Sequence, residues 1–246
     1  PHFANLLEEG IMETGELAEQ YNCYWDDVNG GYLPTPLVKE AREKERAWVK
    51  KEKIYDIVPR SQCFERTGKR PIPLKWVDTN KGDHDNPNVR SRLVCKEIKA
   101  KMKGTSSELG PEEVFSSMPP LEAFMSLITL WVALVPKGYK LAFFDISRAH
   151  FMGKAQRELY VELEEEDLAE YGSDKCGLLR RSMYGTQDAS QIWQKDYTEL
   201  LTSDGFDRGV SNGAVFHKSS TDVRMMVHGG DFAVLGKQVD IDKFEA

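Results

Sequence analysis

Two hydrophobic stretches of this chain each lead into an aspartate. KLAFFDISRAHF carries Asp145, and RMMVHGGDFAVLG carries Asp231 directly after a glycine-rich turn. A carboxylate at the end of a buried strand loses hydration, so it persists mainly where a cation, a hydrogen-bond network or solvent meets it. The two acids therefore point to a shared divalent metal site. The simpler alternative is that each aspartate only ends its strand, because acidic residues are frequent in turns.

The composition predicts a globular protein outside the membrane. Of the 246 residues, 40% are hydrophobic, which is enough for a core in one large domain or two modest ones. The longest apolar run, 124–135, is interrupted by a serine and a threonine and is shorter than the ~20 residues of a membrane helix. The net charge of -7 gives no bulk attraction to nucleic acid, so such binding must depend on local basic patches and metal ions.

The cysteines show neither the C-x-x-C spacing of a zinc site nor the density of a disulfide framework. We therefore expect reduced thiols and an intracellular protein. The four cysteines are Cys23, Cys63, Cys95 and Cys176.

Hydrophobic spacing and turn residues predict an α+β domain with a largely antiparallel sheet. The predicted helices cover 37–53, 120–135, a short segment after residue 145, an acidic stretch at 164–170, and 188–204. The predicted strands cover 71–80, 89–99, 139–145, 158–163, 213–218, 223–227 and 231–236. In the helix at 120–135 we interpret one apolar stripe as core, formed by Leu121, Phe124, Met125, Ile128, Trp131, Val132 and Val135.

Several motifs, taken in order, resemble the reverse transcriptase domain of copia-type LTR retrotransposons over roughly residues 37–246. They are KWVDTNKGD, RSRLVCKE, EEVFSSMPPLEAF, KLAFFDISRAHFMG, RELYVEL, LLRRSMYGTQDASQIWQK and MMVHGGDFAVLG. A single one of these could arise by chance, whereas the whole ordered series indicates the family.

The resemblance implies a right-hand polymerase fold with a mainly antiparallel palm sheet. Residues 37–120 would form the fingers around the hairpin at 72–96, residues 121–246 the palm, and residues 1–36 a linker or upstream boundary segment without assigned function. The thumb would be absent, and the chain would be an internal fragment of a pol polyprotein. The implied partners are an RNA or DNA template-primer, deoxynucleoside triphosphates and the rest of the polyprotein, in a cytoplasmic particle or the nucleus.

The implied chemistry is nucleotidyl transfer supported by two magnesium ions, with Asp145 and Asp231 as catalytic metal ligands. Carboxylate oxygens suit magnesium, and substrate phosphates and water complete its coordination. The sequence departs from the family at the hairpin, where the usual D-D is Gly230 followed by Asp231. Because one acid is missing, we expect severely impaired synthesis.

The resemblance also implies a nucleotide-binding set. Arg92 is the best candidate for the triphosphate, because guanidinium pairs bidentately with phosphate oxygens, and Lys81 is a weaker one. His150 stands where the family has an aromatic residue beneath the sugar, and Tyr184 with Gly185 would line the pocket. Taken without the resemblance, the basic residues are exposed side chains of a hairpin, and His150 is equally a packed histidine.

Two other functions remain open at this level. One is a non-catalytic remnant of such an element that binds nucleic acid or a partner through the basic hairpin. The other is an unrelated metal-dependent hydrolase built on Asp145 and Asp231, which would need no template.

Overall fold

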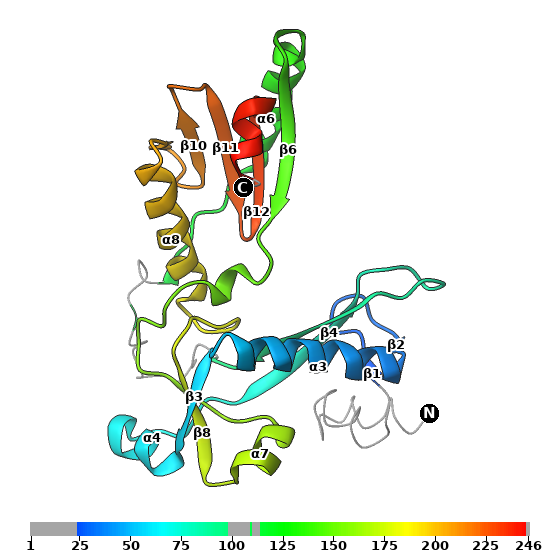
Figure 1. The fold of residues 1–246 in the computed structure, drawn as a ribbon, viewed down its shortest axis with the longest axis vertical. Coiled ribbons are helices and arrows are strands. Elements are labelled where there is room, and N and C mark those ends of the chain that lie inside the picture. Colours follow the sequence, from blue (N-terminus) through cyan, green and yellow to red (C-terminus); the bar gives the residue numbers. More distant parts are fainter. Residues whose placement is uncertain (1–23, 98–108, 110–113, 245–246) are drawn as a thin grey trace. The chain divides into compact units, whose positions relative to one another are not determined.

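The chain forms two compact units in the computed structural model, which describes residues 24–97, 109 and 114–244 (Figure 1). Unit 1 comprises 1–98 and 157–186, and unit 2 comprises 99–156 and 187–246. The sequence suggested a division at residue 120, but 157–186 pack in unit 1 and not with the rest of 121–246. The fingers and palm assignments stay predictions. Much of the expected boundary segment at 1–36, namely 1–23 with Cys23, lies outside the described residues.

Unit 1 contains the predicted hairpin and the helix that precedes it in the sequence. The hairpin strands are β4 (Leu74–Asn80) and β5 (Val89–Cys95), and helix α3 (Thr35–Lys51) packs against β5. Short strands β1 (Tyr24–Trp25) and β2 (Tyr32–Leu33) pair ahead of α3. The helix starts beside Pro34 and Pro36, which suits proline's fixed φ at a first turn, and it buries Val38 and Val49. The predictions for 37–53 and for the hairpin are confirmed.

A second, antiparallel sheet of unit 1 joins segments that are far apart in the sequence. Its strand order is β3-β8-β7, with α4 following β3 and α7 following β7. The bounds are β3 (Tyr55–Pro59), α4 (Arg60–Thr67), β7 (Tyr160–Val161), α7 (Glu165–Tyr171) and β8 (Lys175–Leu179). The pairing of β3 with β8 explains why 157–186 return to unit 1. The sequence patterns did not reveal β3, α4 or β8.

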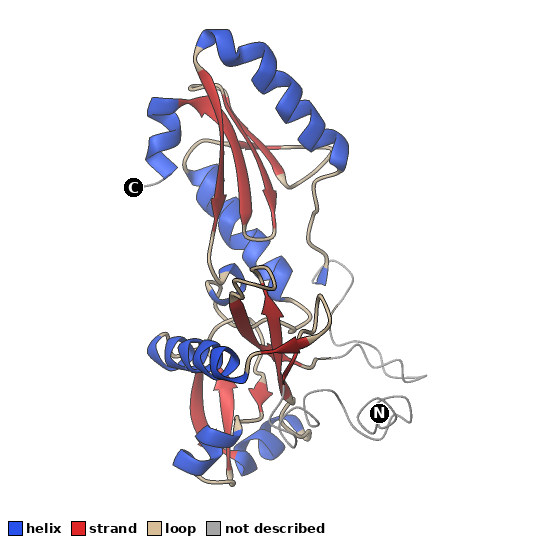
Figure 2. Ribbon diagram, turned by 90° about the vertical axis from the view of Figure 1, so that its right-hand side faces the viewer, coloured by secondary structure: helices blue, strands red, loops and turns tan. Residues whose placement is uncertain are grey.

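Unit 2 is built on a five-stranded antiparallel sheet in the order β6-β12-β11-β10-β9 (Figure 2). The strands are β6 (Tyr139–Asp145), β9 (Asp207–Arg208), β10 (Val215–Lys218), β11 (Val223–His228) and β12 (Asp231–Lys237). The mixed helical and antiparallel architecture expected from the sequence is confirmed.

Two helices cover opposite faces of this sheet (Figure 2). Successive side chains of a strand point to opposite faces, so Met225 and Val227 pack toward α8 (Ala189–Ser203). Met226, Ala233 and Leu235 instead form a cluster with α6 (Leu121–Leu134). Each face thus has its own apolar core, and the ends of β6 and β12 lie at the edge of both.

The predicted core stripe of α6 is partly wrong. Leu121, Met125 and Val132 are 70%, 53% and 62% exposed, although Phe124 and Trp131 do pack on the sheet. The face that packs is Ala123, Phe124, Leu127, Trp131 and Leu134. LEAFMSLITLWVAL is apolar nearly all round, so helical spacing alone does not select one stripe.

The remaining elements of unit 2 are short. The helix expected after residue 145 is only one 3-10 turn, η2 (Ala149–Phe151). Another such turn, η1 (Val135–Lys137), follows α6, while α9 (Gln238–Ile241) and η3 (Asp242–Phe244) follow β12. None of the helices among the described residues combines the length and the apolar character needed to cross a bilayer.

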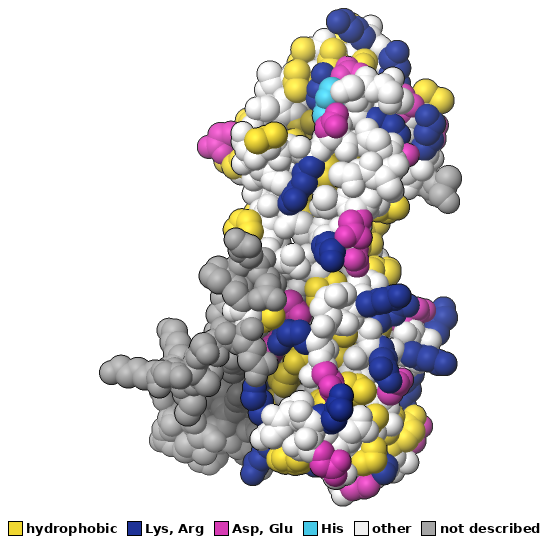
Figure 3. Space-filling model, turned by 90° about the vertical axis from the view of Figure 1, so that its left-hand side faces the viewer, with side chains coloured by type: hydrophobic (Ala, Val, Ile, Leu, Met, Phe, Trp, Pro, Cys, Tyr) yellow, Lys and Arg dark blue, Asp and Glu magenta, His cyan; other side chains and the backbone are white. Residues whose placement is uncertain are grey.

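Basic and acidic side chains are interspersed over much of the surface in Figure 3. Several form ion pairs within unit 1, such as Arg60 with Glu162 at 2.5 Å and Arg157 with Glu97 at 2.8 Å. Because the two signs are mixed, neither a strongly positive nor a strongly negative surface potential is expected, in agreement with the modest net charge of -7.

Candidate active site

Asp145 and Asp231 are direct partners across the ladder between β6 and β12. Opposed residues of an antiparallel pair share a face of the sheet, so both carboxylates leave the same side. That side is the one that α6 covers, because Asp231 is two residues before Ala233, which packs toward α6. Both aspartates are exposed. The structure thus brings the two acids together, and their role as metal ligands stays a prediction.

The turn that presents Asp231 is held at both of its glycines. Gly229 adopts a φ of 62°, a left-handed conformation that glycine reaches without strain. Its carbonyl accepts a hydrogen bond from the Trp193 indole N–H at 2.7 Å, and the Gly230 carbonyl accepts one from the Ile146 N–H at 2.8 Å. Helix α8 and the loop after β6 therefore fix the hairpin next to the acid pair.

Position 230 faces Asp145. A Cβ added to Gly230 would lie 3.5 Å from Asp145 Oδ1, 3.4 Å from the Ala149 Cβ and only 2.9 Å from the Ile146 carbonyl oxygen. A carboxylate at this position would therefore stand beside Asp145. The last distance is too short for a relaxed contact, so the present backbone is fitted to glycine and must shift before it can carry a side chain.

The donor set fits one hard cation better than two. Two exposed carboxylates on one face can hold a magnesium ion whose other ligands are water and substrate oxygens. Within the described part of the chain, no cluster of three or more His, Cys, Asp and Glu side chains is arranged to bind a metal ion. The residues present therefore fit a reduced version of the two-ion site that the sequence suggested.

His150 lies in unit 2, five residues after Asp145 in the sequence, and it forms a hydrogen bond with α8. Its Nε2 lies 3.2 Å from the Ser190 hydroxyl, in the first turn of that helix. Arg148, three residues after Asp145, has a φ of 56°, which is strained for a residue with a side chain. The resemblance would place a proline at position 190, so this contact joins two positions, His150 and Ser190, at which the sequence differs from the family pattern. A role of His150 in nucleotide selection stays a prediction.

Three predicted nucleotide-binding residues meet in unit 1. The Arg92 guanidinium lies over the Tyr184 ring, 5.6 Å from its centroid, and the Cys95 N–H donates to the Tyr184 carbonyl at 2.7 Å. Gly185 has a φ of 84°, and a Cβ there would lie 2.0 Å from the Cys95 carbonyl oxygen. Gly185 is therefore required by backbone packing, whatever else it does. The Arg92 Nε is buried and has no hydrogen-bond partner among the described residues.

Lys81 is not brought to Arg92. In the hairpin Arg92 is opposite Val77, whereas Lys81 lies beyond the last pair of the ladder, with its N–H bonded to the Asn88 carbonyl. Lys81 comes four positions after Val77, which corresponds to roughly 13 Å along an extended chain. Lys81 is exposed at the turn, as the simpler interpretation of this residue held.

Sequence reasoning missed the contribution of Trp193. Helical spacing in 188–204 predicts only that Trp193 packs in the core, which it does, but its indole also donates the hydrogen bond to the hairpin turn. The available signal was chemical, because a buried tryptophan N–H needs an acceptor. The sequence does not say which carbonyl accepts it.

Comparison with known proteins identifies the class. The model of the family described as reverse transcriptase (RNA-dependent DNA polymerase) matches residues 52–243, so the chain belongs to that family. Among curated proteins, it is 25% identical over 203 residues to the retrovirus-related Pol polyprotein from transposon TNT 1-94 of Nicotiana tabacum, which covers 80% of this chain and 14% of that protein.

A second curated relative is also a transposon Pol polyprotein. The retrovirus-related Pol polyprotein from transposon RE2 of Arabidopsis thaliana is 22% identical over 169 residues, covering 67% of this chain and 11% of that protein. The chain is a reverse transcriptase domain of a copia-type element, which confirms the resemblance seen in the motifs. It spans at most 14% of the length of these two relatives. Family membership also argues against an unrelated hydrolase.

A solved structure of telomerase from Candida albicans, in complex with the TWJ fragment of telomeric RNA, is similar at 10% sequence identity. The match covers 91% of this chain and 46% of that chain, with a TM-score of 0.41. A similarity of that size does not establish a common fold.

Proposed function

We propose that this chain is an RNA-directed DNA polymerase domain whose nucleotidyl transfer is impaired by the loss of one acid at Gly230. The register pairing of Asp145 with Asp231 supports this proposal more than any other observation. Two carboxylates from distant segments share one face at the end of a sheet, and position 230 points at one of them.

The reaction needs oxygen ligands at the place where charge develops. A primer 3'-hydroxyl attacks the α-phosphorus of a nucleotide, and pyrophosphate leaves. Reverse transcriptases use divalent ions to stabilise the attacking and leaving oxygens, and Asp145 and Asp231 would hold such an ion. Losing one preorganised electrostatic contact costs ~2.7–4 kcal/mol, which corresponds to a 100-fold to 1,000-fold slower step.

The implied substrates and partners follow from the family. The relatives are Pol polyproteins of transposons, so we propose an RNA or DNA template-primer, deoxynucleoside triphosphates and the remainder of a polyprotein as partners. We propose nucleotide-binding roles for Arg92, whose buried Nε has no hydrogen-bond partner in the described part of the chain, for Tyr184 and Gly185, for His150 and, more weakly, for Lys81.

Magnesium-dependent primer extension tests the proposal, in a chain extended to include a thumb segment. We expect slow extension by the present sequence, faster extension by Gly230→Asp, and loss in Asp145→Asn and Asp231→Asn. Asp207→Asn, which changes an exposed acid on β9, is the matched control and should act as the parent does. If the present sequence extends the primer as fast as the Gly230→Asp variant does, glycine at position 230 does not impair the reaction and the proposal is refuted.

A second candidate is a non-catalytic domain that binds nucleic acid. The missing acid at Gly230 favours it, because losing an electrostatic contact in the active site slows chemistry without removing the basic hairpin. Salt-dependent binding to a primer-template, combined with no incorporation even after Gly230→Asp, would select this candidate.

A further inference from the structure

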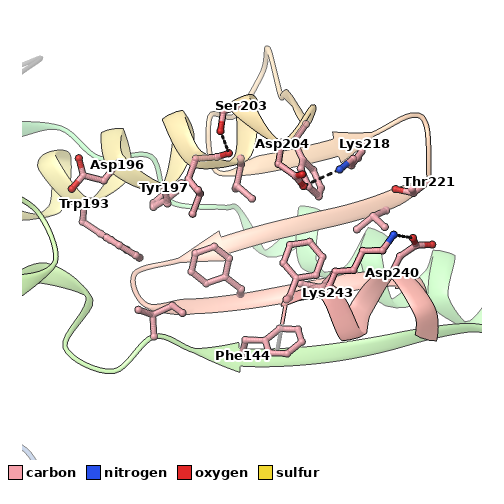
Figure 4. Close-up of a pocket in the computed structure, with 18 residues that line it drawn as sticks. Phe144, Trp193, Asp196, Tyr197, Ser203, Asp204, Lys218, Thr221, Asp240 and Lys243 are labelled. Atoms are coloured by element: carbon pink, nitrogen blue, oxygen red, sulfur yellow. Dashed lines mark hydrogen bonds and ion pairs between the residues drawn. The ribbon is translucent and has the colours of Figure 1, made fainter. Parts of the chain in front are cut away.

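A cavity of about 690 Å³ lies in unit 2 on the α8 face of the sheet, on the side opposite the acid pair (Figure 4). Its walls come from α8, from strands β6, β11 and β12, and from α9 with η3. The size falls within the ~300–1,000 Å³ of small-molecule sites. Since α6 covers the other face, this cavity is separate from the surface that carries Asp145 and Asp231.

Aromatic rings form the floor and one side of the cavity. Phe144 and Phe232 are cross-strand partners and remain only partly buried, although they lie between two helical segments. Trp193 and Tyr197 meet the Phe232 ring edge to face, with centroids 6.4 Å and 5.9 Å apart. Phe244 of η3 lies 6.2 Å from Phe144. Flat apolar walls of this kind suit a flat apolar guest.

Four of the five charged groups that line the cavity form two ion pairs. Lys218 pairs with Asp204, and Lys243 pairs with Asp240, each at 2.8 Å, as the dashed lines in Figure 4 show. A fifth group, Asp196, lies beside Gly153, where an added Cβ would be 2.9 Å from its Oδ2.

The charges along the lining make an anionic ligand unfavourable. The two ion pairs are electrically balanced, and the lining as a whole has one carboxylate, Asp196, in excess of its ammonium groups. An anion would have to approach that excess negative charge, and the aromatic interior offers it little compensation for lost hydration.

We propose that this cavity binds a neutral small molecule with two or three aromatic rings. Aromatic and aliphatic contacts with the walls would stabilise the bound molecule, while the carboxylate in excess along the lining disfavours anions. The proposal does not depend on polymerase activity, because no residue of the acid pair lines the cavity.

A matched pair of fluorescent probes tests the proposal on the full chain. N-phenyl-1-naphthylamine is neutral and apolar, and 8-anilinonaphthalene-1-sulfonate adds one negative charge to the same ring system. We expect saturable binding of the neutral probe with one site per chain. The sulfonate should bind about tenfold more weakly, because it must lose its hydration near unbalanced carboxylate charge.

Substitutions locate the bound probe. Leu200 lines the cavity, is 69% exposed, and can become tryptophan without disturbing the core. Leu200→Trp and Ser203→Trp should each weaken binding about tenfold by filling the entrance. Val210→Trp adds the same indole at a fully exposed position outside the cavity, and Met125→Lys alters the exposed face of α6. Both controls should bind as the parent does.

Several results would overturn the proposal. Non-saturable binding would mean that the probe coats apolar surface in general. Equal or tighter binding of the sulfonate would mean an anion site. Unchanged binding in both Leu200→Trp and Ser203→Trp, or loss in Met125→Lys, would place the probe elsewhere.

Discussion

Asp145, the last residue of β6, and Asp231, the first residue of β12, oppose each other across the β6–β12 ladder. The backbone register alone brings the two carboxylates to one face. A single cation between them would relieve their mutual repulsion, which otherwise works against this pairing.

We therefore predict that each acid contributes to divalent-ion binding. Asp145→Asn and Asp231→Asn should each weaken Mn²⁺ binding about tenfold, or ~1.4 kcal/mol, measured by electron paramagnetic resonance of the free ion. Asp207→Asn on β9 should leave the affinity unchanged, because this exposed acid lies at the opposite edge of the sheet. Equal loss in all three variants would indicate a diffuse surface effect instead of a site.

Restoring the acid at position 230 should carry a steric cost. The Cβ of any residue there would meet the Ile146 carbonyl oxygen at 2.9 Å, so both Gly230→Ala and Gly230→Asp should lower the free energy of unfolding by ~1–3 kcal/mol. Only Gly230→Asp adds a metal ligand next to Asp145. Magnesium should therefore restore stability to Gly230→Asp and not to Gly230→Ala.

Denaturant unfolding with and without magnesium measures both effects. If Gly230→Ala is as stable as the parent, the loop after β6 moves freely and the glycine is not fitted to its place. If magnesium stabilises both variants equally, the added carboxylate does not reach the ion.

The acid pair could be predicted because its signals are local. Each aspartate follows its own apolar strand, and a glycine-rich turn marks the second hairpin. The register could not be predicted, because a slip of one residue would move Asp231 to the other face of the sheet while keeping the same sequence pattern. Only the assembled ladder shows that Asp145 and Asp231 meet.

The elements that sequence reasoning missed depend on distant partners. Strand β3 is stabilised by β8, more than a hundred residues later, and neither carries a strong alternating pattern. In α6 the apolar signal is too widespread, where in β3 it is too weak. Apolar residues occur on all sides of the helix, so their spacing does not show which side is buried. Tertiary packing therefore determines both the formation of β3 and the buried face of α6.

The hydrogen bond from Trp193 to the hairpin turn should stabilise the site region. Trp193→Phe keeps most of the ring but removes the donor to the Gly229 carbonyl, and we expect a loss of ~1 kcal/mol in the free energy of unfolding. The Ile146 amide, which bonds to the adjacent Gly230 carbonyl, should then exchange its hydrogen faster. Trp25→Phe, at a partly exposed indole, is the matched control. Unchanged exchange at Ile146 would show that α8 does not hold the turn.

The stability of unit 1 should fall as pH rises from about 4.5 to about 7. Burial raises the pKa of Glu164 to about 7, helped by the nearby Glu166 and Asp167 carboxylates and opposed by Trp76 and Arg42. A raised carboxyl pKa means that the folded state binds the proton more tightly than the unfolded state does. The favourable contribution is therefore complete below the unfolded value of 4.5 and is lost as pH rises to about 7.

Glu164→Gln separates this effect from other titrations, because glutamine resembles the protonated acid at every pH. Above pH 7 the variant should be more stable than the parent, on the order of 2 kcal/mol after allowing for partial solvent exposure, and below the unfolded pKa the two should agree. Urea unfolding across this range measures the difference, with Glu65→Gln on the exposed side of α4 as the control. A Glu164→Gln variant that is less stable than the parent at high pH would mean that the ionised carboxylate is stabilised in the fold, which would reverse the sign of the pKa shift.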